Sequence, residues 1–133
     1  MNGVFQAIDL NTGKVVWSFP AGSSIYAGAT LDKDLAIIGT TGGMIYALHT
    51  DSGSVAWKTN LGSVINSSAI VSGNTVYVGT LKKILFALSL ADGSTVWKQE
   101  TTGRIKTSPA VAKGFLFVAT DERLILAFRG SPQ

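Results

Sequence analysis

The chain has 133 residues, of which 46% are hydrophobic and 14% charged, and its formal net charge is +3. This length suffices for one compact domain, but the charged fraction is well below the roughly 25% of a typical soluble domain, so much of the surface should be covered. The absence of cysteine excludes disulfides and thiol catalysis. The cations are dispersed, which argues against a nucleic-acid partner, and no apolar run approaches the roughly 18 residues of a membrane span.

Short segments rich in β-branched and aromatic residues follow one another along the chain, separated by turn signals such as Ser72-Gly73-Asn74 and Ala91-Asp92-Gly93. No window shows a sustained helical period of apolar residues, so the predicted fold class is all-β with almost no helix. In chain order, the segments that we expect to form strands include 4–9, 15–19, 68–71, 75–80, 84–88, 95–99, 109–112, 115–120 and 124–128.

A repeat of 40 residues runs through the whole chain. Repeats of 40 to 45 residues with four antiparallel strands each predict a β-propeller, in which the four-stranded sheets, or blades, pack face to face around a channel. Two slips are expected in the third copy, a residue gained before Gly103 and one lost near Gly114. The residues that recur at this interval are Ala7, Ala47 and Ala87, then Gly13, Gly53 and Gly93, and finally Trp17, Trp57 and Trp97.

The repeat predicts a single partial β-propeller domain over 1–133, with about three blades. Its parts are a half-blade at 1–21, full blades at 22–62 and 63–102, and an incomplete blade at 103–133. Three blades cannot close a ring, because propellers typically have 4 to 8. We therefore expect either a piece of a larger propeller or self-association through the unpaired edges of the terminal blades, most simply as a pair giving six blades.

The first copy contains the pattern Ala-x-Asp-x-x-Thr-Gly-x-x-x-Trp, which begins at Ala7 and ends at Trp17, and the later copies carry His49 and Ser89 in place of the motif aspartate Asp9. This pattern resembles the tryptophan-docking motif of the PQQ-type, quinoprotein-like β-propeller repeats, a family that includes BamB-like periplasmic propellers. The resemblance implies that the tryptophan of one blade packs on the alanine and the glycine-bearing turn of its neighbour. It also implies a periplasmic or other extracytoplasmic location, which the residues alone leave undetermined.

Quinone-dependent dehydrogenases with this repeat use a catalytic aspartate and a calcium ion. Of the eight carboxylates here, most fall in predicted hairpin turns, and His49 is the only histidine, so no Ser-His-Asp triad can form within one chain. The sequence therefore predicts no catalytic residue, no cofactor and no metal. We expect a non-enzymatic scaffold or binding module for protein–protein interaction, the alternative being a fragment of a PQQ-dependent dehydrogenase without its catalytic residues.

The segment that leads into the first strand of each blade should lie beside the central channel. It carries Tyr26 in the first copy, Asn66 in the second, and Arg104 and Lys106 in the third. Only the third copy brings charge to this place, so Arg104 and Lys106 are candidates for binding an anionic ligand or an acidic peptide. The alternative is that both are solvated surface cations.

Overall fold

A computed structural model describes residues 3–121 and 125–129 of the chain. The described residues form thirteen β-strands and no helix, so no helix in this part of the chain is long and apolar enough to cross a membrane. The all-β fold class is confirmed. The strands are β1 (Val4–Ile8), β2 (Val15–Pro20), β3 (Thr30–Asp32), β4 (Leu35–Gly39), β5 (Met44–His49), β6 (Val55–Asn60), β7 (Ile70–Ser72), β8 (Thr75–Gly79), β9 (Ile84–Ser89), β10 (Thr95–Glu100), β11 (Ala110–Ala112), β12 (Phe115–Ala119) and β13 (Ile125–Arg129).

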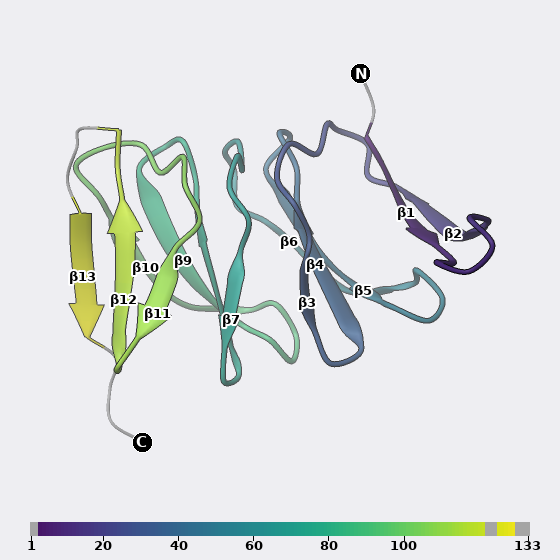
Figure 1. The fold of residues 1–133 in the computed structure, drawn as a ribbon. Helices are drawn as coiled ribbons and strands as arrows, with labels where there is room; N and C mark the ends of the chain where they lie inside the picture. The colour runs from purple at the N-terminus through teal and green to yellow at the C-terminus, as the bar shows by residue number, and fades with distance from the viewer. Residues whose placement is uncertain (1–2, 122–124, 130–133) are drawn as a thin grey trace.

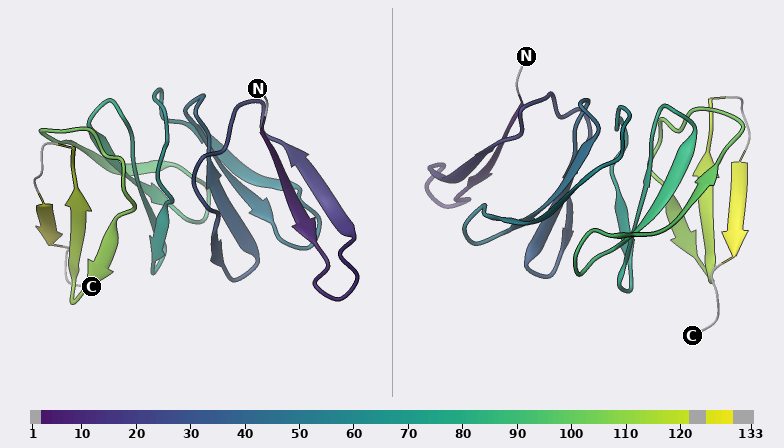
Figure 2. Two further views of the ribbon diagram at one scale, coloured as in Figure 1. Left: turned by 45° about the horizontal axis from the view of Figure 1, so that its top comes forward. Right: turned by 180° about the vertical axis from the view of Figure 1, so that it is seen from behind.

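The strands form four antiparallel sheets that stand side by side in chain order (Figures 1 and 2). The first sheet pairs β1 with β2, the second has the order β3-β4-β5-β6, the third β7-β8-β9-β10, and the last β11-β12-β13. Each sheet is an up-and-down meander, because hairpins join strands that are adjacent in the sequence. This arrangement is a partial β-propeller, as predicted.

The first strand of each blade is shorter than the sequence suggested, since β7 begins at Ile70 rather than at residue 68. Ser68 instead connects three blades: its backbone N–H donates to Oγ of Ser108 at 3.1 Å, and its own Oγ donates to the carbonyl of Gly28 at 2.8 Å. These three residues are 40 positions apart. The polar residues before the first strands therefore bond between blades and not within a sheet.

Alternating side chains pack each blade against its neighbours. In β12, Leu116 and Val118 are buried with Leu85 of the preceding blade and with Ile105. A larger cluster joins the second and third sheets, and Ile45, Ile65, Val76 and Leu88 are among its fully buried side chains. Both faces of an inner blade thus contribute to the core, which explains the high apolar fraction of the sequence.

The 40-residue phase does not slip in the third copy, contrary to our expectation. The backbone N–H of Thr41 donates to the carbonyl of Ser24, Leu81 donates likewise to Val64, and Asp121 donates to Arg104. The three pairs are equivalent and keep the interval of 40. Arg104 therefore corresponds to Val64, and the shift of a glycine from position 62 to 103 leaves the register of the backbone unchanged.

Two isoleucine side chains pack against glycines at the junctions between blades. A side-chain carbon at Gly79 would lie 2.2 Å from Cγ2 of Ile105, and one at Gly39 would lie 2.4 Å from Cγ2 of Ile65. Both isoleucines are fully buried, so they have no room to move aside. Glycine is required at both positions by this close approach and not by its backbone angles.

We expect Gly79→Ala to lower the free energy of unfolding by roughly 1–3 kcal/mol, because the added methyl group overpacks the junction against Ile105. Gly28→Ala is the matched control, since its new methyl group would meet only Oγ of Ser68 at 3.7 Å. Urea unfolding of both variants measures the difference. Equal stability of the two variants would contradict the close packing at Gly79.

Candidate functional site

The tryptophan and glycine that recur every 40 residues make the same contact at two blade junctions. Nε1 of Trp57 donates a hydrogen bond of 2.8 Å to the carbonyl of Leu90, and Nε1 of Trp17 donates one of 2.8 Å to that of Thr50. Each acceptor belongs to the turn between the third and fourth strands of the next blade. The indole thus satisfies its single polar group while its rings cover a neighbouring turn.

Glycine makes this close contact between the indole and the turn possible. A side-chain carbon at Gly93 would lie 2.3 Å from Cε3 of Trp57, and one at Gly53 would lie 2.5 Å from Cε3 of Trp17. Both glycines also have a φ of +76°, in the left-handed region that other residues rarely adopt. We call the contact of an indole with such a turn an indole seat.

The alanines of the motif lie elsewhere than the resemblance implied. Ala47 is the cross-strand partner of Trp57 in its own sheet, and Ala7 and Ala87 pair in the same way with Trp17 and Trp97. The small side chain stands directly opposite the indole within one blade. The glycine turn is supplied by the following blade.

The three tryptophans share a repeat position, and their common spacing predicts equivalent burial, but Trp17 is half-buried, Trp57 is buried and Trp97 is exposed. Trp57 is 6% exposed, whereas Trp97 is 37% exposed and has the ring of Tyr77 at a centroid distance of 6.0 Å. The position 40 residues after Gly93 is Gln133, which lies outside the described residues. A glycine seat of the kind found at Gly53 and Gly93 is therefore not among the described contacts of Trp97.

The opposite end of the chain has a glycine turn without an indole. Gly13 has a φ of +72°, as its equivalents do, but no atom of the described structure would lie within 4 Å of a side-chain carbon there. The motif residue Asp9 closes this turn, since its Oδ1 accepts hydrogen bonds from the backbone of Asn11 and Thr12. The turn is formed and its outer surface is uncovered.

Of the residues predicted beside the channel, Tyr26 is 73% exposed and Lys106 is also exposed. Asn66 is half-buried. Its Oδ1 and Oγ of the adjacent Ser67 are buried without a hydrogen-bond partner among the described residues. The three residues Tyr26, Asn66 and Lys106 occupy the same repeat position, one after Ile25, Ile65 and Ile105, of which the last two are buried.

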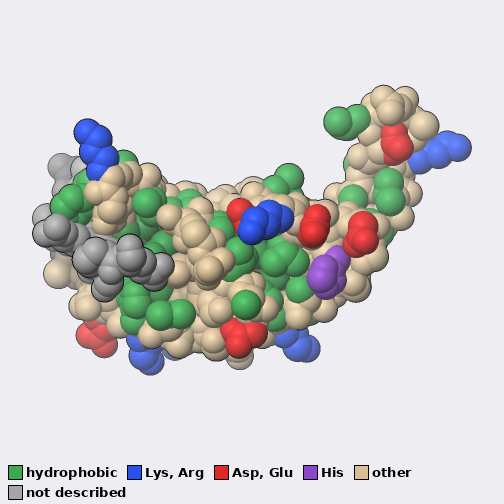
Figure 3. Space-filling model, turned by 90° about the horizontal axis from the view of Figure 1, so that it is seen from below, with side chains coloured by type: hydrophobic (Ala, Val, Ile, Leu, Met, Phe, Trp, Pro, Cys, Tyr) green, Lys and Arg blue, Asp and Glu red, His purple; other side chains and the backbone are tan. Residues whose placement is uncertain are grey.

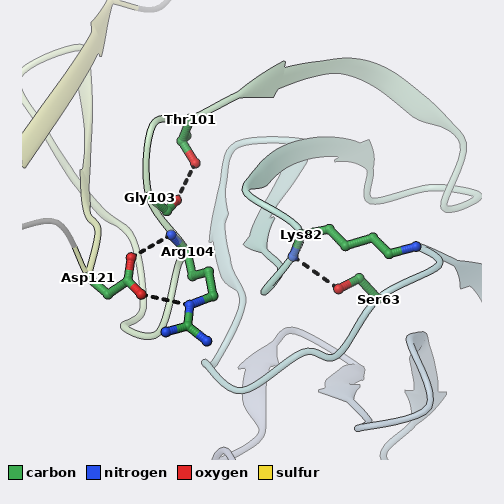
Figure 4. A network of polar contacts seen from close by, with 6 residues as sticks. All are labelled: Ser63, Lys82, Thr101, Gly103, Arg104 and Asp121. Carbon is green, nitrogen blue, oxygen red and sulfur yellow. Dashed lines mark hydrogen bonds and ion pairs between the residues drawn. The ribbon is translucent and has the colours of Figure 1, made fainter.

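Arg104 forms an ion pair that the sequence did not reveal. Asp121 accepts from Nε of Arg104 through Oδ2 at 2.7 Å and from the backbone N–H of Arg104 through Oδ1 at 2.7 Å (Figure 4). The side-chain hydrogen bond from Arg104 is the main cause that lowers the pKa of Asp121, followed by its backbone hydrogen bond, while the charges of Arg104 and Lys106 contribute less. Because the pKa falls on folding, this contribution to stability is present above the ordinary pKa of aspartate and is lost as the pH falls through the lowered value.

The signal for this pair was the spacing of 17 residues that also separates Ser24 from Thr41 and Val64 from Leu81. The assumed slip before Gly103 hid this equivalence. The sequence therefore identified Arg104 as a candidate and missed Asp121, the residue that fixes its position.

The opposite edge of the blades carries a shallow hollow beside the single histidine, seen from below in Figure 3. Its lining residues are Asp32, Lys33, Asp34, Leu35, His49 and Leu90. Within the described part of the chain, no group of three or more His, Cys, Asp or Glu side chains is placed to hold a metal ion. The imidazole of His49 also makes none of the described side-chain hydrogen bonds, unlike Asp9 and Ser89 at the same repeat position.

The side-by-side blades and the indole seats define a β-propeller of the tryptophan-docking type. The chain belongs to the family described as outer membrane protein assembly factor BamB, which it matches over residues 1–130. The predicted resemblance is thereby confirmed. No curated protein sequence matches the chain.

Solved structures agree with this fold. The chain is similar to BamB from Moraxella catarrhalis, with a TM-score of 0.84 and 26% identity over 96% of this chain and 40% of that chain. It is also similar to the computationally designed Ika4 protein (TM-score 0.87, 13% identity, 97% of this chain and 81% of that one). A third match is the quinohemoprotein alcohol dehydrogenase from Comamonas testosteroni (TM-score 0.75, 16% identity, 88% and 26%). The chain thus spans less than half the length of the BamB that it matches.

We expect Trp57→Ala to lower the free energy of unfolding by roughly 3–5 kcal/mol, as for other buried aromatic residues. Trp97→Ala is the matched control from the same repeat position, and its cost should be smaller because Trp97 is partly solvated. Thermal and urea unfolding measure both values. A cost below about 0.5 kcal/mol for Trp57→Ala would mean that the indole seat does not stabilise the fold.

Proposed function

We propose that this chain is a non-enzymatic propeller scaffold for protein–protein interaction, and that further propeller blades cover its two terminal sheets. Those blades belong either to the rest of a larger propeller or to a second copy of the chain. The membership in the BamB family supports a role in protein assembly and a periplasmic or other extracytoplasmic location. It leaves the individual partner open.

The observation that carries this proposal is a difference in solvent exposure between side chains at equivalent repeat positions. Leu48 and Leu88 are fully buried because the preceding blade covers them, whereas Ile8 is 53% exposed on the uncovered face of the first sheet. An isoleucine in solvent at a position built for the core marks a surface that another blade would cover. Val4 and Val16 are exposed on the same face.

Two further features of the first sheet support an additional blade there. The turn at Gly13 has the shape of an indole seat and carries no indole. Leu10 is fully solvent-exposed, whereas its equivalent Leu90 is buried and donates its backbone N–H to Asn74 in a hairpin turn of its own blade. The described part of the first sheet contains no strand that could supply such a turn.

The last sheet presents the complementary kind of surface. Phe115 and Phe117 alternate with the buried Leu116 and Val118, and their rings are 38% and 37% exposed on the outer face. Ile37, the equivalent of Phe117, is buried in the cluster that joins two blades. The two ends of the chain therefore offer opposite faces of a blade, as a head-to-tail contact requires.

The alternative function is a fragment of a PQQ-dependent dehydrogenase. The likeness to the quinohemoprotein alcohol dehydrogenase concerns the fold only. We expect no saturable binding when the chain is titrated with pyrroloquinoline quinone and calcium ions, because the chain has no cysteine and its described residues hold no convergent set of acidic ligands. Isothermal titration calorimetry tests this, and micromolar binding would refute the scaffold proposal.

We also expect the isolated chain to self-associate at micromolar concentration, because both terminal faces expose apolar side chains. Light scattering measures the mass. Ile8→Lys should shift the chain towards the monomer by placing a charge in the contact, whereas Asn11→Lys, in the exposed turn of the same hairpin, should leave the mass unchanged. A monomeric mass for the unsubstituted chain would exclude association between copies.

A further inference from the structure

Four cations lie on two loops that meet where the second full blade adjoins the last sheet, and we call them the cationic rim: Lys82, Lys83, Arg104 and Lys106. They belong to one hydrogen-bonded unit. The carbonyl of Lys83 accepts from the N–H of Thr101, the carbonyl of Thr80 accepts from the N–H of Ile105, and the N–H of Asp121 donates to Arg104. The turn between β8 and β9 and the segment before β11 are thereby held together.

Asp121 holds Arg104 in place and does not bond the two terminal nitrogens of its guanidinium group. Asp121 uses one carboxylate oxygen on the backbone N–H of Arg104 and the other on Nε. Figure 4 joins neither terminal nitrogen of Arg104 to Asp121, and the side chain is 50% exposed. A guanidinium fixed through Nε presents its terminal N–H groups as a planar fork, which matches the two oxygens of a carboxylate.

The rim is specific to this junction. At the preceding junction, the equivalents of Lys82 and Lys83 are Gly42 and Gly43, and the equivalents of Arg104 and Lys106 are Val64 and Asn66. The face as a whole is therefore not basic, as adsorption to an anionic membrane would require. The four cations instead lie on the loops of two adjoining blades.

The backbone of the rim adds a second observation. Lys83 has a φ of +65°, while glycine occupies the equivalent position of the first full blade with a φ of +90°. A residue with a side chain is strained in this left-handed region, where glycine is not. The chain thus carries a charge at a turn position whose backbone favours glycine, as it also does at Lys33 and Lys113.

The opposite edge of the blades has an acidic excess. Its hairpin turns hold five aspartates, Asp9, Asp32, Asp34, Asp51 and Asp92, beside three lysines, Lys14, Lys33 and Lys113. An acidic segment that approaches the molecule is therefore favoured at the rim over that edge. The two edges of the blades therefore differ in charge, which the net charge of +3 does not show.

We propose that the cationic rim binds an acidic, extended segment of a protein partner. The terminal nitrogens of Arg104 grip one carboxylate of that segment, Lys82, Lys83 and Lys106 attract its neighbours, and Asp121 acts as the positioning residue of Arg104. This inference rests on the scaffold function proposed above and names the chemistry of the partner.

The test uses the full chain and a fluorescein-labelled synthetic peptide of about a dozen residues in which Asp and Glu alternate with Ser. Fluorescence anisotropy should show saturable binding that weakens with added salt. Arg104→Gln should lower the affinity about tenfold, and Arg104→Lys should lower it at least threefold, because lysine keeps the charge and loses the fork. Lys14→Gln, in an exposed turn of the opposite edge, removes the same charge and should change the affinity less than twofold.

Asp121→Asn separates positioning from simple attraction. It raises the net charge by one, so diffuse attraction predicts tighter binding, whereas loss of the positioned fork predicts binding weakened at least threefold. Circular dichroism checks that each variant is folded. Unchanged or tighter binding by both Asp121→Asn and Arg104→Lys would overturn the proposal.

Vesicles of phosphatidylcholine with about a third phosphatidylserine form the second arm of the test. Sedimentation of the chain with these vesicles, without saturable binding of the peptide, would overturn the assignment of a protein segment. A chain that self-associates as expected but does not bind the peptide would also overturn this inference, and it would leave the scaffold proposal standing.

Discussion

The structure depends on the seat of an indole on a glycine turn of the next blade. The four sheets share no paired strands, so their mutual arrangement is set by side chains that cross the junctions. Trp17 and Trp57 each cross one junction, and each ends on a backbone carbonyl 33 residues further along the chain. The buried Ile65 lies beside Gly39 in the junction that Trp57 crosses, and the buried Ile105 lies beside Gly79 in the next junction. The junction between the second and third sheets therefore has both kinds of contact.

The fold was predictable because this contact needs particular residues at a fixed interval. An indole requires a turn without side chains, and a left-handed turn requires glycine, so both leave a clear periodic trace in the sequence. Gly103, in the segment between two blades, gave a misleading signal about the register of the repeat. Gly62 has a φ of +76°, but Thr102 occupies the equivalent position in the next copy without a positive φ, so the glycine at 103 does not mark a slip.

The candidate site was less predictable. Arg104 stood out as a charge at a position held by uncharged residues in the other copies, whereas Asp121 looked like an ordinary turn residue. Their pairing depends on the contact between two loops, which the spacing reveals only after the register is known. Open ends and a cationic rim at an inner junction suit a scaffold that holds further blades and a partner at separate surfaces.

Amide hydrogen exchange in Trp57→Ala tests the central claim most directly, because each indole seat should stabilise the turn on which it rests. The account predicts faster exchange of the Gly93 amide, which donates to the carbonyl of Ser89 beneath the indole of Trp57. The Gly53 amide, in the equivalent turn under Trp17, should exchange as in the unsubstituted chain. Unchanged protection at Gly93, or an equal loss at Gly53 and Gly93, would contradict the account.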